Sequence, residues 1–432
     1  MEPCYLTAAD AAARIRAKTL TCEELVRSCL RRIDERDAAV RAFIHVDPAR
    51  AIAKARELDK CPPLGPLHGI PFAVKDMIDT GDMPTTHNSP LYQGHQPAKD
   101  AGCVAVVRHN GALILGKTDT VEFASGGRKA LTRNPHNLAH TPGGSSSGSG
   151  AAVADYMVPL AFGTQTGGSH IRPASFNGIY GLKPTWSAVT REGAKMLSPM
   201  CDTVGWYGRS VADLQLVAEA FRIFSPAAEK SVDASQLRVA VVQTPYWDRA
   251  EPAGREAVAI AAKRLQQAGA KIEDLTLPTP FSSTFEAQET IMYGEGAAAF
   301  LPELLAHGDR LHPDLRAMAE NSRNVTGRAM AAAHDLVADC RKTFDAFFNA
   351  FDVVLTPSVP GEAPEGLHTT GDWVFNAFWT ILHVPCLAIP CAKGSKGLPV
   401  GIQIVGPRYG DARLLRIAEP VAVAVDVERA KT

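Results

Sequence analysis

Residues 141–185 read TPGGSSSGSGAAVADYMVPLAFGTQTGGSHIRPASFNGIYGLKPT. Two serines in this stretch, Ser145 and Ser169, are flanked by glycine and joined by an apolar segment. Glycine lets the backbone turn sharply and bring bare N–H groups close to a ligand. Consecutive N–H groups that converge on one point bind negative charge. The stretch therefore predicts a serine nucleophile beside an oxyanion site.

The composition is that of an ordinary globular protein. The chain has 432 residues, of which 46% are hydrophobic and 21% charged, and its formal net charge is −1. The small net charge and the lack of basic runs argue against a nucleic-acid partner. Because the sequence has no signal pattern and no apolar run of about 18 residues, we expect a cytoplasmic protein without membrane contact. The nine cysteines include no C-x-x-C pair, so we expect free thiols and no metal or other cofactor.

Helix and strand signals are intermingled along the chain. The predicted helices cover 6–19, a segment beginning at Thr21, 103–109 and 255–268. The predicted strands cover 70–74, 112–116, 237–242 and 353–356, with a hairpin over 386–405. This mixture is typical of an α/β fold with a mixed sheet. Since no linker or internal repeat is present, we expect a single domain over residues 1–432.

Two short motifs match known patterns without the context that those patterns need. Residues 111–118, GALILGKT, fit the phosphate-loop pattern, but their apolar centre resembles a strand, which has no N–H groups free for phosphate. Residues 144–148, GSSSG, fit the nucleophile-elbow pattern, but no apolar strand precedes them and no downstream histidine has a telling context. We therefore predict neither nucleotide binding nor a histidine-assisted serine.

Lys75 is the candidate base for the serine nucleophile. It follows the apolar run IPFAV, so its amine is expected to be at least partly buried, and burial favours the neutral amine. A neutral lysine can take a proton from a serine hydroxyl. Asp76 and Asp79 lie close in sequence and would instead keep the lysine charged. The spacing leaves both outcomes open.

Four segments together resemble the amidase signature family. They are GIPFAVKDMIDT (69–80), GALILGKTDT (111–120), the whole of 141–185, and SPMCDTVGWYGRS (198–210). The resemblance implies the amidase signature fold, a large mixed central β-sheet flanked on both sides by α-helices. It also implies a signature core at about 65–210 and a peripheral helical part at about 250–350. Within the family, the TQTGGSxIRPAS form is most similar to bacterial malonamidase-like enzymes.

The resemblance implies a Ser–cis-Ser–Lys triad that hydrolyses an amide through an acyl-enzyme. Ser169 is the implied nucleophile, and Ser145, after a cis peptide bond, passes the proton to Lys75. The implied oxyanion hole consists of backbone N–H groups of Thr166, Gly167 and Gly168, together with that of Ser169 itself.

The implied substrate-binding residues are Arg172, Ser147 and Tyr293. In malonamidase-like relatives, an arginine at the position of Arg172 binds the substrate carboxylate, a role that suits the planar fork of a guanidinium. Ser147 belongs to the first serine loop, where hydrogen bonds to the backbone are the alternative role. Tyr293 is expected to border the acyl pocket, although its surroundings match malonamidase-like sequences poorly.

The expected partner is a small-molecule amide, and a homodimer is the expected assembly. Three other functions are compatible with the same residues. The chain could be the glutamine-hydrolysing subunit of a tRNA amidotransferase, a role for which it is somewhat short. It could be an ester or carbamate hydrolase, because the acyl chemistry is shared. It could also be a non-catalytic binding protein, against which the intact triad argues.

Overall fold

The structure is a computed structural model that describes residues 2–227 and 232–425. Within these residues, one mixed sheet has the strand order β1-β3-β2-β4-β6-β5-β10-β11-β9-β7-β8. The strands are β1 (Phe43–Val46), β2 (Pro71–Lys75), β3 (Leu113–Thr118), β4 (Leu160–Gln165), β5 (Tyr180–Lys183), β6 (Thr203–Gly208), β7 (Arg238–Val242), β8 (Lys271–Leu275), β9 (Val353–Pro357), β10 (Cys386–Lys393) and β11 (Pro399–Val405).

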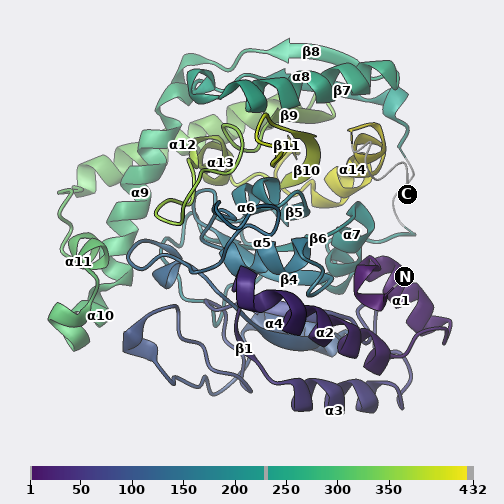
Figure 1. The fold of residues 1–432 in the computed structure, drawn as a ribbon. Coiled ribbons are helices and arrows are strands. Elements are labelled where there is room, and N and C mark those ends of the chain that lie inside the picture. Colours follow the sequence, from purple (N-terminus) through teal and green to yellow (C-terminus); the bar gives the residue numbers. More distant parts are fainter. Residues whose placement is uncertain (1, 228–231, 426–432) are drawn as a thin grey trace.

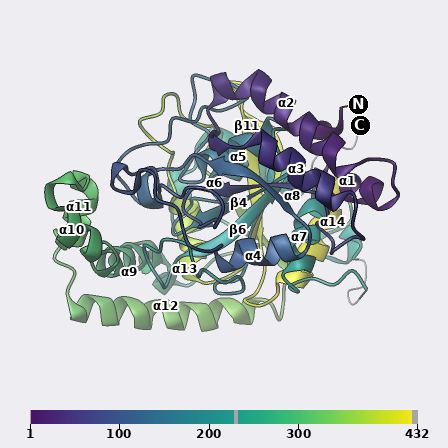
Figure 2. The same ribbon diagram turned by 90° about the horizontal axis from the view of Figure 1, so that it is seen from below.

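Helices lie against both faces of this sheet, as the two views in Figures 1 and 2 show. They are α1 (Ala8–Arg16), α2 (Cys22–Val40), α3 (Pro48–Leu58), α4 (Gly102–His109), α5 (Ser147–Ala154), α6 (Ile171–Phe176), α7 (Val211–Ala220), α8 (Pro252–Gln267), α9 (Thr284–Ala299), α10 (Leu301–His307), α11 (Pro313–Ala319), α12 (Gly327–Phe347), α13 (Val374–Ile381) and α14 (Asp411–Val425). The expected α/β fold with a large mixed sheet is therefore confirmed. None of the helices in these residues is long and apolar enough to cross a membrane.

Helix α8 and strand β8 belong to the sheet region, whereas helices α9 to α12 form a helical extension. Helix α8 packs against β9, β10 and β11, and β8 is the edge strand beside β7, so residues 252–275 belong to the sheet and its covering layer. Helices α9 to α12 extend to one side of the sheet (Figure 1). The apolar face of α8 was visible in the sequence, but it did not reveal whether the helix packs on the sheet or on other helices.

Local signals placed several elements correctly. Thr7 caps α1 and accepts a hydrogen bond from Asp10, while Thr21 and Glu24 form the predicted capping box of α2. Gly269 follows α8 with φ at 95°, a conformation in which glycine avoids the clash of a Cβ. The phosphate-loop pattern at 111–118 lies largely in the buried strand β3. Strands β4 and β6 were not predicted, because each has an interior glycine, which is uncommon in strands.

The order of the central strands brings the predicted site together. Strands β2 and β4 are parallel neighbours, paired at Phe72 with Leu160 and at Val74 with Phe162. Their carboxyl ends therefore lie at the same edge of the sheet. Lys75 is the last residue of β2, and Ser169 follows the end of β4 by four residues. Helix α5, which follows Ser145, packs against β2, β3 and β4.

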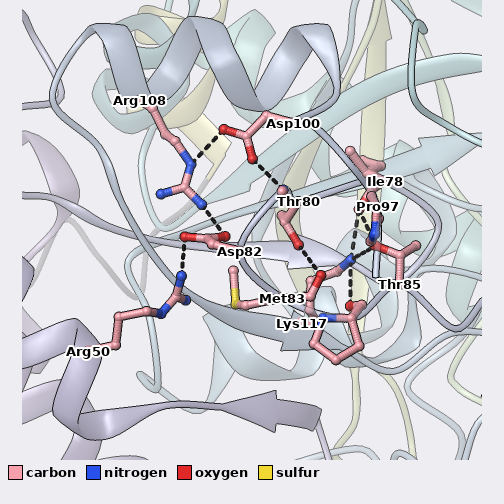
Figure 3. A network of polar contacts seen from close by, with 12 residues as sticks. Arg50, Ile78, Thr80, Asp82, Met83, Thr85, Pro97, Asp100, Arg108 and Lys117 are labelled. Atoms are coloured by element: carbon pink, nitrogen blue, oxygen red, sulfur yellow. Dashed lines mark hydrogen bonds and ion pairs between the residues drawn. The ribbon is translucent and has the colours of Figure 1, made fainter. Parts of the chain in front are cut away.

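A polar network fixes the segment that follows Lys75. Figure 3 shows the Asp82 carboxylate between Arg50 of α3 and Arg108 of α4, with Arg108 donating at 2.7 Å. In the same view, the buried Lys117 amine of β3 donates to the carbonyl of Ile78 at 2.8 Å and to the hydroxyl of Thr85 at 2.5 Å. These contacts fix the chain beyond β2 and so support the position of Lys75.

Candidate functional site

Lys75 is completely buried, and its amine is surrounded by hydroxyl groups. The Nζ atom lies 2.7 Å from the Oγ of Ser145, 3.0 Å from the Oγ of Ser146 and 2.7 Å from the Oγ1 of Thr164. The side chain extends from the end of β2, whereas its partners come from the loop before α5 and from β4. The Thr164 hydroxyl thus helps to hold the Lys75 amine in place.

The hydrogen bonds around Ser146 determine how a neutral Lys75 can be oriented. The Ser146 hydroxyl donates its only proton to the carbonyl of Thr164 at 3.2 Å, so it can only accept from Lys75. A neutral amine has two N–H donors and one lone pair. If Ser146 and Thr164 accept the two N–H bonds, the lone pair faces the Ser145 hydroxyl. Lys75 is then oriented to take a proton from Ser145.

Burial favours the neutral amine, one of the two outcomes that the sequence left open for Lys75. Burial lowers the pKa of Lys75 well below its usual value of 10.5, and the opposing influence is the negative charge of Asp202. Asp76 does not pair with Lys75. Its carboxylate forms a buried ion pair with Lys117 at 3.3 Å and accepts from the hydroxyl of Thr86 at 2.5 Å. Burial therefore shifts the equilibrium of Lys75 towards the neutral amine.

Ser145 and Ser169 line the same cavity, whose volume is about 220 Å³. The peptide bond between Gly144 and Ser145 is cis, as the resemblance implied. Ser169 is held through its backbone, since its carbonyl accepts from the N–H of Ser146 at 3.3 Å. Among the described residues, the Ser169 hydroxyl forms no hydrogen bond. The structure thus joins Lys75 to Ser145 directly and brings Ser169 to the cavity that Ser145 lines.

The backbone between β4 and α6 carries the predicted oxyanion donors. Thr166, Gly167, Gly168 and Ser169 all line the cavity. Among the described residues, the N–H groups of Gly167, Gly168 and Ser169 donate to no protein acceptor. A Cβ on Gly167 would lie 1.8 Å from the Cε3 of Trp373, so glycine is required there for the loop to pass this ring.

Arg172 brings a buried positive charge to the cavity wall. Its Nη2 donates to the carbonyl of Gly144 at 2.5 Å and to the hydroxyl of Thr370 at 2.9 Å. Its Nε and Nη1 atoms are buried and have no acceptor among the described residues. Burial lowers the pKa of Arg172 to about 10, against the influence of Asp372. Unpaired buried donors on a cation are costly, so this guanidinium is suited to an anion.

Of the other two predicted substrate-binding residues, one lines the cavity and one does not. Tyr293 of α9 lines it, and the guanidinium of Arg323 lies 3.4 Å from the centre of the tyrosine ring. Ser147 is buried at the start of α5 and donates to the carbonyl of Gly143 at 2.7 Å. Because this hydroxyl stabilises the serine loop and does not line the cavity, we keep it out of the proposed binding site.

Several cavity residues have no signal in the sequence, and His170, next to Ser169, is buried against Tyr207. Lys129, Thr370, Met292 and Met318 line the cavity, but they lie in loops and helices without any motif. His170 stacks on Tyr207 with ring centres 4.0 Å apart, and burial lowers its pKa to about 3. Within the described residues, no group of three His, Cys, Asp or Glu side chains could hold a metal ion.

The fold and the site define an α/β protein whose cavity is built from two serine loops and a buried lysine. Residues 24–415 match the family described as Amidase, and the chain belongs to this family. The predicted resemblance is therefore confirmed. The chain is an amidase, an enzyme that hydrolyses the C–N bond of amides.

Known proteins resemble the chain along almost its whole length. One subunit of the glutamyl-tRNA(Gln) amidotransferase of Acidothermus cellulolyticus is 32% identical, over 97% of this chain and 94% of that protein. A crystal structure of an amidase superposes with a TM-score of 0.88 at 27% identity, over 97% of this chain and 100% of the other. The structure of a peptide amidase from Stenotrophomonas maltophilia superposes with a TM-score of 0.80 at 27% identity, over 98% of this chain and 97% of the other.

The lowered pKa of Lys75 predicts the pH dependence of activity. With the free amine as the expected base, we expect kcat/KM to rise with pH through this lowered pKa and to level off below pH 10.5. The measurement is a pH profile of kcat/KM on an amide substrate. Lys75→Met should remove the rise together with most of the activity, whereas Lys129→Met, at an exposed cavity residue, should keep it. A profile that keeps its shape in Lys75→Met would contradict the assignment.

Proposed function

We propose that the chain hydrolyses a small carboxamide that bears a carboxylate, with Ser169 as the nucleophile. The observation that carries the proposal is the buried Lys75 amine, 2.7 Å from the Ser145 hydroxyl, beside a cavity that Ser145 and Ser169 line. A serine needs a base to become a good nucleophile. The neutral lysine supplies one without a histidine.

In the proposed reaction, the Ser169 hydroxyl attacks the amide carbonyl and gives its proton to Ser145, which passes its own proton to Lys75. The N–H groups of Thr166, Gly167, Gly168 and Ser169 stabilise the oxyanion that forms. The ammonium of Lys75 then returns a proton through Ser145 to the leaving nitrogen. An amine or ammonia departs and Ser169 keeps the acyl group as an ester. Water attacks this ester by the same proton route and releases the acid.

The charges on the cavity wall support an acidic substrate. Arg172 and Lys129 line the cavity, and no aspartate or glutamate is among its described lining residues. Met292, Met318 and Trp373 line the same cavity and give it apolar thioether and aromatic surface. A substrate with a carboxylate at one end and a short apolar body fits this distribution. The monoamide of a short dicarboxylic acid, such as malonamate, belongs to this class.

Removing the Ser169 hydroxyl should abolish turnover. We expect Ser169→Ala to lower kcat by about 10⁴-fold or more, as deletion of a nucleophile does in serine hydrolases. The measurement is ammonia release from a panel of short amides, with hydroxylamine added to trap the acyl-enzyme as a hydroxamate. Ser125→Ala is the matched control, because Ser125 lines the cavity but lies outside the proposed proton route. Retained turnover in Ser169→Ala would refute the proposed nucleophile.

Arg172 should determine the preference for acidic amides. We expect Arg172→Gln to lower the ratio of kcat/KM for acidic over neutral amides by about 10- to 100-fold, the range for losing a charge-assisted hydrogen bond. The ratio is the useful measure, because Arg172 also holds the carbonyl of Gly144 and its loss affects both substrates. Arg323→Gln removes a cation that stacks on Tyr293 and should keep the ratio. An unchanged ratio in Arg172→Gln would exclude the carboxylate-binding role.

A second candidate function is hydrolysis of glutamine as one subunit of an amidotransferase. The relative from Acidothermus cellulolyticus favours it, and this chain covers 94% of that protein, so length does not argue against the role. Such a function would need partner proteins.

Turnover of glutamine by the isolated chain separates the two candidates. We expect the purified chain to hydrolyse a short dicarboxylic monoamide with a higher kcat/KM than glutamine, because the described cavity lining has no carboxylate for the α-ammonium group. Ammonia release from each compound is the measurement. A preference for glutamine would favour the amidotransferase function.

A further inference from the structure

Three consecutive carbonyl groups of the proposed oxyanion loop each accept a hydrogen bond, two of them from distant side chains. The Thr166 carbonyl accepts from Nε2 of Gln288 in α9 at 3.1 Å. The Gly167 carbonyl accepts from the Thr380 hydroxyl in α13 at 2.8 Å. The Gly168 carbonyl accepts from the N–H of Arg172 at 3.1 Å. Three consecutive peptide units are therefore fixed on their carbonyl side.

A fixed carbonyl also fixes the N–H group of the next residue. In a trans peptide the C=O and the following N–H point in opposite directions. Gln288 and Thr380 do not line the cavity, whereas Gly167 and Gly168 do. The carbonyls that these two side chains hold therefore point away from the cavity. The N–H groups of Gly167 and Gly168 point towards it, and both lack an acceptor among the described residues.

Gln165 determines where the single proton of Thr380 goes. Its Nε2 donates to the Thr380 oxygen at 2.9 Å, so Thr380 cannot donate back to Gln165. The proton of Thr380 is left for the Gly167 carbonyl and for the carbonyl of Asn376 one turn earlier in α13, at 2.9 Å. The Oε1 atom of Gln165 accepts from the N–H groups of His170 and Ile171, both at 2.9 Å. One amide thus connects the loop, the start of α6 and Thr380.

We propose that Gln288 and Thr380 are positioning residues that aim the oxyanion donors of Gly167 and Gly168 at the substrate. The proposal rests on Ser169 being the nucleophile. Neither side chain touches the reacting atoms. Both are buried, and each is separated from its loop partner by a long stretch of sequence, 122 and 213 residues. The helices α9 and α13 thereby contribute to catalysis through backbone orientation.

The test measures how fast a fluorophosphonate labels Ser169, because phosphonylation places an oxygen in the same hole. We expect Thr380→Val, which keeps the shape and removes the hydroxyl, to lower the second-order labelling rate by about 10- to 100-fold. This is less than the roughly 10²- to 10³-fold loss for a deleted oxyanion donor, because the N–H group is misaligned and not removed. Thr380→Ser should restore most of the rate. Gln288→Met should lower it independently through Gly167. With p-nitrophenyl acetate as the substrate, Thr380→Val and Gln288→Met should each lower kcat and leave KM nearly unchanged.

Thr343→Val is the matched control. The Thr343 hydroxyl donates to the carbonyl of Asp339, one turn earlier in α12, at 3.0 Å. Thr343 is exposed and lies far from the oxyanion loop in sequence. This variant should label like the wild-type chain. Equal labelling rates in the wild type, Thr380→Val and Gln288→Met would overturn the inference, as would a Thr380→Ser rate as low as that of Thr380→Val. A wild-type chain that is not labelled at Ser169 would overturn the proposed nucleophile as well.

Discussion

The site depends on an amine that is buried without a carboxylate against it. Lys75 is enclosed by three hydroxyl oxygens, which hydrogen-bond a neutral amine well but compensate an ammonium poorly. The next residue, Asp76, would reverse this if it reached the same group. Asp76 directly follows β2, and its pairing with Lys117 keeps its carboxyl group away from the Lys75 amine.

Close packing of side chains against glycine backbone gives the serine loops their positions around this amine. A Cβ on Gly163 in β4 would lie 2.6 Å from Nδ1 of His170 and 2.9 Å from the Ser146 hydroxyl. The loop before α5 can therefore lie against β4 only because residue 163 has no side chain. The same holds for Gly167 under the ring of Trp373. The glycines of 141–185 therefore allow other residues to pack closely against the backbone, in addition to allowing sharp turns. One of the residues packed in this way is Ser146, which also contacts Lys75.

The sequence revealed the site residues that belong to a recognisable motif. It did not reveal those that reach the site only through the fold. Lys75, Ser145 and Ser169 stood out because an apolar strand end and two glycine-flanked serines have recognisable patterns. The local composition of the GSSSG run could not distinguish the roles of Ser146 and Ser147. Their roles separate only when Ser146 meets Lys75 and Thr164, and Ser147 meets Gly143. Thr370 and Gln288 had no signal, because hydrogen bonds between distant segments leave no periodicity.

The charge of the cavity wall favours a simple anion over a zwitterion. Arg172 is nearly fully buried, so its charge is only weakly solvated, and its free Nε and Nη1 atoms have an unmet demand for acceptors. The carboxylate of the proposed substrate would meet that demand. An amino acid would also bring an ammonium group into a cavity that already has Arg172 and Lys129, and whose described lining includes no acidic side chain. Burying that ammonium beside like charges is unfavourable, so the same electrostatics that attract a carboxylate disfavour glutamine.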